Sequence, residues 1–452
     1  MNCFIGLDMG TSAVKGALVS EAGETIATAS GEYRYDVDEK NHSKLLSPEE
    51  FINVCFDVVN KLADCCKAGD RVAAICPCCA SGNLVLLDEN GAPLIPIIGW
   101  QSSIPKEDFD RYFTQEECDE LYTKIGWRPF PGFPLAYLAW IHENRRDLLD
   151  RAKTVCMSAE YFNYALTGKL GISPSMGTPF YLMDQAKGEY NRELLDRIGV
   201  REEQLPPILD KGTVVGTVTA DAANRVKLAE GTPVVLGSFD HPSCATGAGV
   251  YDKGEMLLSC GTSWVEFFPT DSREFAIGTK FLVDRYMLSD STYCVMCSIA
   301  SISVKIDNLR RALLGVISHK EFDELSLKAP AGCNGLEFKF DENDAERAKG
   351  HDKYDIARAI TESAAKMLKA NLIRAEEKGL RADRITMVGG MTNSAVCVKI
   401  IAETLGRDIR VVNGVSAGAV GAAMLAGIGA GTFNGERDAF RKMNFKETVY
   451  TA

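Results

Sequence analysis

The chain has 452 residues, of which 46% are hydrophobic and 25% charged, a balance typical of a folded protein long enough for two domains. The formal net charge of −12 argues against a nucleic-acid partner, because phosphate backbones are bound by basic surfaces. No run of about 18 uncharged apolar residues is present to span a membrane, and the start MNCFIGLDMG is unlike a signal peptide. We therefore expect a cytoplasmic protein with no membrane partner.

The fifteen cysteines are expected to be reduced thiols in that compartment. Cys55 and Cys65 are predicted to lie on the apolar face of one helix, where cysteine packs as a small hydrophobic residue. Cys76, Cys78 and Cys79 raise a metal site as an alternative. Zinc sites usually need two pairs of ligands, and the candidate second pair lies in the other predicted domain, so packing is the favoured interpretation. Any further role of the triplet is left open.

The N-terminal half opens with three predicted strands at residues 3–8, 13–20 and 25–35, with a tight glycine turn between the first two. A helix is predicted next, with Ser47 as its N-cap, Pro48 at the first helical position and Gly69 at its end. The run RVAAICPC that follows is predicted to be a buried strand.

The C-terminal half repeats this opening, with a strand at MLLSC, a Gly-Thr turn and a strand at WVEFFPT. Alternating helices and strands follow, which indicates mixed α/β architecture. The predicted elements are strands at 281–288, 292–297, 384–390 and 409–413, and helices at 354–378, 393–405 and 416–428. We predict two domains of duplicated plan, residues 1–248 and 249–452.

The first chemical motif is IGLDMGTSAVK, in which a strand delivers Asp8 to its C-terminal end. A carboxylate beside a phosphate-binding turn is suited to hold hydrated Mg²⁺ against the phosphates. A plain hairpin turn is the alternative interpretation. The residues that would hold an anion through backbone N–H groups, hydroxyls or a positive charge are Gly10, Thr11, Ser12 and Lys15.

Two further turns are candidate nucleotide sites. SCGTSW repeats the strand and Gly-Thr turn with Gly261 and Thr262, and it can hold phosphates opposite the first turn. In MVGGMTNS a strand ends at Gly389 and Gly390, where the backbone can approach a flat ligand such as adenosine. Asn393 or Ser394 can cap the next helix, and an ordinary turn remains the alternative for both motifs.

The fourth motif is GSFDHPSCATGAGV, in which an apolar strand runs into Asp240. A carboxylate at such a junction can accept a proton from a substrate hydroxyl. A helix-capping Asp is the alternative. His241 is either a substrate contact or a packing residue.

In this order along the chain, the motifs resemble those of the FGGY family of carbohydrate kinases, which belongs to the actin, hexokinase and chaperone ATPase superfamily. The resemblance covers almost the whole chain. It rests on IGLDMGTSAVK, CGTSW, VGGMTNS and the small-residue run GAVGAAMLAG, with shorter matches such as YFNYALTG and LPPILDKGTVVGTVT between them.

This resemblance implies an α/β fold of two ribonuclease-H-like domains with a nucleotide and substrate cleft between them. It implies ATP and Mg²⁺ as cofactors and transfer of the γ-phosphoryl group to a hydroxyl of a sugar or polyol. Asp240 matches the catalytic base, and Asp8 matches the carboxylate near Mg²⁺. The positions that match the nucleotide site are Gly10, Thr11, Ser12, Lys15, Gly261, Thr262, Gly389, Gly390 and Asn393.

The residues that choose the substrate depart from the family pattern. Where xylulose kinases have Gly-Gln-Met-His-Gly, this chain reads CASGN, so D-xylulose is not favoured. The run LIPIIGWQS is more similar to kinases of the L-fuculose type, which favours a ketose. Trp100 can pack on the C–H face of a sugar and Asn83 can bind its hydroxyls, whereas a core tryptophan and a turn residue are the alternatives.

Two other functions stay open. A superfamily relative can hydrolyse ATP to drive a conformational change in a partner, as activators of acyl-CoA dehydratases do. A sugar-binding regulator on an inactive kinase fold is the other alternative. Many family members form homodimers, and no stretch of the sequence identifies an interface.

Overall fold

The computed structural model describes residues 1–39, 42–80, 82–412 and 416–452, and the chain forms two compact units. The first unit consists of Met1–Gly249, Asp271–Cys294 and Val415–Asn444. The second unit consists of Val250–Thr270, Val295–Gly414 and Phe445–Ala452. Two segments of the C-terminal half therefore belong to the first unit. The division of the sequence into domains at residues 1–248 and 249–452 stays a prediction.

The first unit is built on a six-stranded mixed sheet. Its strands, in spatial order, are β12 (Val214–Thr217), β13 (Pro233–Val235), β6 (Arg71–Cys79), β1 (Asn2–Met9), β2 (Ala13–Ser20) and β3 (Thr25–Glu32). The central strand β1 runs parallel to β6 and antiparallel to β2. Because β1 and β6 are almost fully buried, they read as continuous apolar runs rather than as alternating ones.

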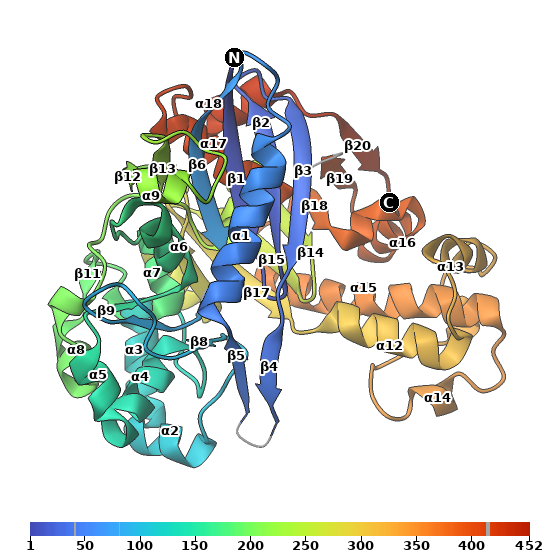
Figure 1. Cartoon of the computed structure of the whole chain (residues 1–452). Coiled ribbons are helices and arrows are strands. Elements are labelled where there is room, and N and C mark those ends of the chain that lie inside the picture. Colours follow the sequence, from blue (N-terminus) through green and yellow to red (C-terminus); the bar gives the residue numbers. More distant parts are fainter. Residues whose placement is uncertain (40–41, 81, 413–415) are drawn as a thin grey trace. The chain divides into compact units, whose positions relative to one another are not determined.

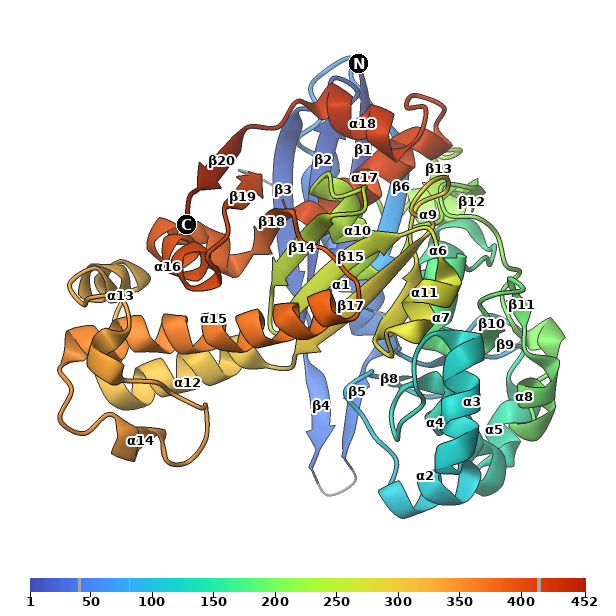
Figure 2. The ribbon, with the colours of Figure 1, turned by 180° about the vertical axis from the view of Figure 1, so that it is seen from behind.

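Helices cover both faces of this sheet. Helix α1 (Pro48–Ala63) packs on β2 and β3, and α17 (Ala417–Gly429) packs on β1 and β6. Figure 1 shows α1 in front of the strands, and Figure 2 shows α17 from the opposite side. The remaining helices of the unit are α2 (Lys106–Tyr112), α3 (Gln115–Ile125), α4 (Phe133–Asn144), α5 (Arg146–Arg151), α6 (Ser158–Thr167), α7 (Pro174–Phe180), α8 (Arg192–Arg197), α9 (Ala220–Ala223), α10 (Asp240–Gly247), α11 (Arg273–Gly278), α18 (Glu436–Met443) and the 3₁₀ turn η1 (Glu202–Gln204).

Short strands complete the first unit. They are β4 (Tyr35–Asp38), β5 (Ser43–Leu46) and β8 (Ile97–Ile98) in one small sheet, β7 (Val85–Leu87) paired with β9 (Thr154–Cys156), β10 (Met183–Asp184) paired with β11 (Glu189–Tyr190), and β16 (Leu282–Arg285), on which α7 packs.

The second unit contains a sheet of the same plan. Of the seven strands of this sheet, those assigned to the second unit are, in spatial order, β17 (Tyr293–Ile299), β15 (Trp264–Thr270), β14 (Glu255–Cys260), β18 (Arg384–Gly389), β19 (Ile409–Val412) and β20 (Glu447–Tyr450). The helical segments of the unit are α12 (Ile302–Leu314), α13 (His319–Ser326), α14 (Asp344–Arg347), α15 (Lys353–Glu377), α16 (Ala395–Leu405) and the 3₁₀ turns η2 (Cys333–Gly335) and η3 (Gly390–Asn393).

The duplicated plan is visible in the strand pairing. In each unit a central strand, β1 or β14, is antiparallel to the next strand along the chain and parallel to a later one, β6 or β18. Each sheet then continues through a further parallel strand to an antiparallel edge strand. The predicted α/β architecture with a repeated opening is therefore confirmed.

Most predicted elements are present, with two differences. Ser47 caps α1 as expected, but the helix ends at Ala63 rather than at Gly69. Cys55 is buried on this helix, whereas Cys65 lies beyond its end and is exposed, so the prediction for Cys65 was wrong. Because helix α1 ends at Ala63, Cys65 does not continue the apolar face of the helix. None of the helices in the described ranges is both long and apolar enough to cross a membrane.

Candidate active site

The acidic centre of the first unit begins at the C-terminal end of β1. Asp8 pairs across the sheet with Lys15 on β2, so the two side chains share a face. On that face, a Cβ atom placed on Gly418 would lie 2.5 Å from Oδ2 of Asp8. The start of α17 therefore approaches the carboxylate so closely that only a glycine fits.

Glycines also let α17 pack directly on its neighbours. A Cβ atom on Gly6 of β1 would lie 1.9 Å from the carbonyl oxygen of Ala419, and one on Gly421 would lie 2.0 Å from the carbonyl oxygen of Ser243. The hydroxyl of Ser243 donates to the carbonyl of Gly418 at 2.8 Å. Helix α17 is thus held between β1 and α10, whose ends carry Asp8 and Asp240.

Asp240 is the first residue of α10. Phe239, the residue before it, pairs with Cys79 at the end of β6 in a parallel bridge. Because β6 lies beside β1, the chain brings Asp240 to the same edge of the sheet as Asp8, the edge where α/β proteins bind ligands. Oδ1 of Asp240 accepts the backbone N–H of His241 at 2.7 Å.

The two acids have raised proton affinities. Burial raises the pKa of Asp8 to about 7, the negative charge of Asp240 adds to the rise, and Lys15 lowers it. Burial also raises the pKa of Asp240, although the His241 ring and backbone N–H oppose the shift. Mutually repelling, partly desolvated carboxyl groups at a sheet edge are typical of a functional site.

The turn after β1 is held by its own contacts. The N–H of Gly10 donates to the carbonyl of Ala13 at 2.9 Å, and the Tyr33 hydroxyl donates to the carbonyl of Gly10. The backbone N–H groups of Thr11 and Ser12 make no hydrogen bond to another residue within the described ranges. These two amides are therefore the donors that the turn can offer to an anion.

Trp100 and Asn83 are connected to this turn. The indole Nε1–H of Trp100 donates to the hydroxyl of Thr11 at 3.1 Å. Asn83 is buried, accepts the backbone N–H of Trp100 at 2.9 Å, and donates to the Ser158 hydroxyl at 2.7 Å. Asn83 thus positions Trp100 through its amide, and its predicted contact with a substrate stays a prediction.

An aromatic row joins Trp100 to His241. Ring centroids lie 6.2 Å apart between Trp100 and Phe133, 5.9 Å between Phe133 and Trp127, and 5.4 Å between Trp127 and Phe239. The last step, from Phe239 to His241, is 5.3 Å. Trp100 and His241, two of the predicted substrate residues, therefore lie at the two ends of one packed cluster, and both keep part of their surface exposed.

In the second unit, two of the predicted nucleotide loops lie side by side. Cys260 at the end of β14 pairs in parallel register with Gly389 at the end of β18, so Gly261 and Gly390 begin adjacent loops at one sheet edge. Gly389 has a φ of +100°, and a Cβ atom there would lie 2.4 Å from the carbonyl oxygen of Cys260. This strand end therefore requires glycine.

These loops are open on one side and supported on the other. A Cβ atom on Gly390 would meet nothing within 4 Å, and Thr262 and Asn393 are exposed. Ser303, which the sequence analysis missed, donates its hydroxyl to the carbonyl of Gly261 at 2.6 Å. Of the two candidate caps, Ser394 is the one that caps α16, by accepting the N–H of Cys397.

The cysteine triplet lies inside the first sheet. The Cys78 thiol contacts the carbonyl of Gly418 at 3.5 Å, and the Cys79 thiol lies 3.9 Å from the Ser158 hydroxyl. Burial raises the pKa of all three thiols, as expected for unreactive core residues. Within the described part of the chain, no group of three or more His, Cys, Asp or Glu side chains is arranged to hold a metal ion.

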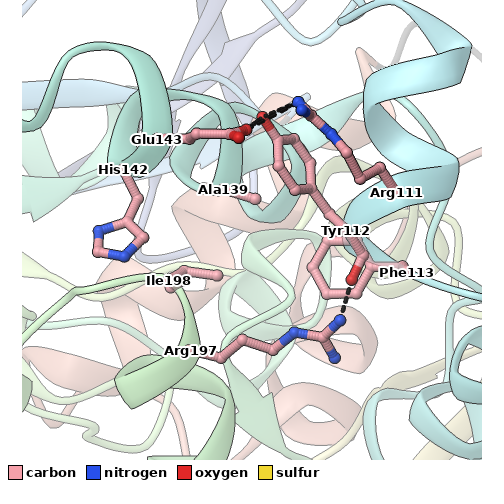
Figure 3. Close-up of a pocket in the computed structure, with 8 residues that line it drawn as sticks. All are labelled: Arg111, Tyr112, Phe113, Ala139, His142, Glu143, Arg197 and Ile198. Carbon is pink, nitrogen blue, oxygen red and sulfur yellow. Dashed lines mark hydrogen bonds and ion pairs between the residues drawn. The ribbon is translucent and has the colours of Figure 1, made fainter.

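Figure 3 shows a pocket elsewhere in the first unit, between α2, α4 and α8. Its arginines already have acidic or carbonyl partners: Arg111 pairs with Glu143 at 2.8 Å, and Arg197 pairs with Glu117 at 2.8 Å and binds the Tyr112 carbonyl. The lining residues, none of them a predicted site residue, are Arg111, Tyr112, Phe113, Ala139, His142, Glu143, Arg197 and Ile198. With its positive charges neutralised, the pocket does not resemble an anion site.

Comparison with known proteins assigns the family. Residues 3–247 match the N-terminal domain of the FGGY family of carbohydrate kinases, and residues 341–430 match its C-terminal domain. The chain therefore belongs to the FGGY family of carbohydrate kinases, which is a family of phosphotransferases that use ATP.

Individual relatives are more distant. The chain is 29% identical over 274 residues to the xylulose kinase of Lactococcus lactis subsp. lactis (strain IL1403), which covers 59% of this chain and 53% of that protein. It is 25% identical over 468 residues to the autoinducer-2 kinase of Yersinia enterocolitica, covering 95% of this chain and 86% of that protein. The crystal structure of a ligand-bound xylulose kinase from Lactobacillus acidophilus matches with a TM-score of 0.88 at 21% identity, covering 100% of this chain and 94% of that chain. This likeness confirms the fold, which is that of the actin-like ATPases.

Proposed function

We propose that this kinase transfers the γ-phosphoryl group of ATP to a hydroxyl of a ketose-type sugar, with Asp240 as the general base. The observation that carries the proposal is the pair of partly desolvated carboxyl groups, Asp8 and Asp240, at one edge of the first sheet. Two acids in different surroundings can take different roles, one toward a metal ion and one toward a proton.

Each of these residues has one proposed role in the transfer. Asp240 accepts the hydrogen bond of the substrate hydroxyl and takes its proton as the new O–P bond forms and the bond to ADP breaks. The free amides of Thr11 and Ser12 bind phosphate oxygens, and Lys15 adds a positive charge beside Asp8. The proposed nucleotide contacts of the second unit are Gly261, Thr262, Gly389, Gly390 and Asn393.

A magnesium ion fits the donor set at Asp8. Mg²⁺ is usually bound by one or two carboxylates together with substrate phosphates and water, so a complete cage of protein ligands is not needed. The raised pKa of Asp8 means that its negative charge is poorly compensated by the protein alone. Mg²⁺ would neutralise charge on the phosphate oxygens, and Asp8 is the residue that would hold it.

A ketose substrate is supported by two kinds of likeness. Xylulose, named in one relative, is a ketose, and the run LIPIIGWQS is similar to kinases of the L-fuculose type. Trp100 would pack on a C–H face of the sugar, and His241 would contact a hydroxyl near Asp240. A cytoplasmic location and a homodimer also stay predictions.

The test is an ADP-release assay with Mg-ATP and a panel of acceptors. The panel contains L-fuculose, L-rhamnulose, both enantiomers of ribulose and xylulose, autoinducer-2, glycerol, erythritol and sugar acids. We expect one ketose to stimulate ADP release strongly, and the stimulation to be lost in Asp240→Asn. Release of ADP that no acceptor stimulates would favour an ATP-driven switch, and binding of ATP without turnover would favour a regulator.

Trp100→Phe is expected to raise the KM for ATP by about three- to tenfold while changing the KM for the sugar little. The phenyl ring keeps the packing surface, but the hydrogen bond to Thr11, worth about 1 kcal/mol, is lost. Steady-state kinetics with each substrate varied in turn would measure this. Trp100→Ala is the comparison, because it also removes the ring face and should raise the KM for the sugar. An unchanged KM for ATP in Trp100→Phe would exclude the role.

A further inference from the structure

The peptide that precedes Asp240 is held by a side chain from another element. The backbone N–H of Phe239 donates to Oγ of Ser175 at 3.2 Å, and the carbonyl of Phe239 accepts the N–H of Ser243 at 3.1 Å. The Phe239 ring is packed between Trp127 and His241. Both ends of this residue are thus fixed, and Asp240 follows it directly.

Ser175 is in turn bound by a buried carboxyl group. It lies in the first turn of α7 with 2% of its surface exposed, and its Oγ lies 3.1 Å from Oδ2 of Asp284 on β16. A hydroxyl has a single proton to donate. Since the N–H of Phe239 is itself a donor, the Ser175 hydroxyl accepts that hydrogen bond and donates its own hydrogen bond to Asp284. With Asp284 ionised, the direction of this series of hydrogen bonds is therefore determined.

Asp284 is firmly placed for this task. It is 0% exposed, and its Oδ1 accepts the backbone N–H of Arg285 at 2.7 Å. Burial raises the pKa of Asp284 to about 7, although hydrogen bonds from Thr178, Arg285 and Ser175 and the charge of Lys211 oppose the rise. An apolar residue would avoid the cost of burying this carboxyl group, so its presence requires a reason beyond packing.

These contacts involve a segment of the C-terminal half that belongs to the first unit. Asp284 comes from this segment, Asp271–Cys294. Its backbone is held there by two hydrogen bonds of Val283, to the carbonyl of Gly126 at 3.0 Å and from the side chain of Gln185 at 3.0 Å. The segment thereby delivers the carboxyl group that holds the Ser175 hydroxyl, and that hydroxyl in turn accepts the N–H of Phe239, the residue before the proposed base.

We propose that Ser175 and Asp284 are positioning residues, which orient the peptide before Asp240 and so place the Asp240 carboxylate for proton transfer. The proposal rests on the proposed function of Asp240. Neither residue needs to touch the sugar or the nucleotide. They act on the geometry of the base, and a small misplacement of a catalytic group can lower the rate strongly.

The test compares Ser175→Ala with Ser173→Ala. Ser173 starts the same helix, is 1% exposed and accepts the N–H of Met176 at 3.3 Å, so its loss weakens α7 without touching Phe239. We expect Ser175→Ala to lower kcat by about tenfold or more with the KM for ATP unchanged, and Ser173→Ala to leave kcat within about twofold. Amide hydrogen exchange at Phe239 should become at least about tenfold faster in Ser175→Ala only, because a lost hydrogen bond of about 1.4 kcal/mol is a factor of ten.

The outcomes separate the proposal from the proposed function. If Ser175→Ala has the kcat and the exchange rate of Ser173→Ala, the positioning role is wrong while the kinase assignment stands. If neither the wild type nor Asp240→Asn phosphorylates any acceptor, the proposed function fails. Exchange at Phe239 then still decides the structural claim, since an unchanged rate in Ser175→Ala overturns it without any activity measurement.

Discussion

Asp240→Asn is expected to lower kcat by more than about a hundredfold while ATP binding remains close to that of the wild type. The amide keeps the size of the side chain and can still accept the N–H of His241, so the start of α10 should be preserved. It cannot accept the proton of the substrate hydroxyl. Titration with a fluorescent ATP analogue and steady-state kinetics on the best acceptor would separate the two effects.

The competing interpretation of Asp240 is electrostatic support of a helix. The N-cap of α10 is Phe239, not Asp240, and the cap makes no side-chain hydrogen bond, so such support would come from charge alone. Asp221 in the first turn of α9 is a matched control, because Asp221→Asn removes the same charge from an exposed helix start. Such charges contribute about 0.3–1 kcal/mol. Equal kinetics for the two variants would exclude Asp240 as the base.

The sequence was most informative where chemistry and local conformation coincide. The strand that ends at Asp8, the Ser47 cap of α1 and the paired Gly-Thr turns are local signals, and the structure has each of them. The run of small residues that includes Gly418 could also be recognised in the sequence, but the sequence did not show why small residues are needed there. Only the fold shows that it brings a helix against the Asp8 carboxylate.

Long-range partners could not be found from the sequence. Ser175 and Asp284 are 109 residues apart, and nothing in either local pattern indicates that they meet. The return of Val415–Asn444 to the first unit depends on how α17 packs against β1 and α10, which no local propensity determines. The substrate contact predicted for Asn83 stays a prediction, but no local pattern indicated that its buried amide would bind Ser158 and the backbone of Trp100.

Asp8→Asn is expected to affect activity and stability in opposite directions. The variant loses the carboxylate proposed to hold the metal ion beside the phosphates, so kcat should fall by about a hundredfold, the usual cost of removing one electrostatic contact in a transition state. The same change should raise the free energy of unfolding at pH 8 by about 2 kcal/mol. Kinetics and urea denaturation on one preparation would measure both effects.

The sign of the stability change follows from the direction of the pKa shift. Folding raises the pKa of Asp8 from its ordinary 3.8 to about 7, so between these values the folded state holds a proton that the unfolded state has released. Stability therefore falls as pH rises through this window, and the full penalty is present above about pH 7. Asparagine cannot ionise and avoids the penalty. The gain should be smaller than the full shift implies because Asp8 is partly exposed.

Measurement at two pH values separates this effect from a general change in packing. Asp8→Asn should be more stable than the wild type at pH 8 and equal to it near pH 4, where the Asp8 carboxyl is protonated in the folded state. A gain of the same size at both pH values would mean that the amide merely packs better, and a loss at pH 8 would mean that Lys15 already compensates the charge. A gain confined to high pH would show that the protein gives up stability to keep a negative charge where catalysis needs it.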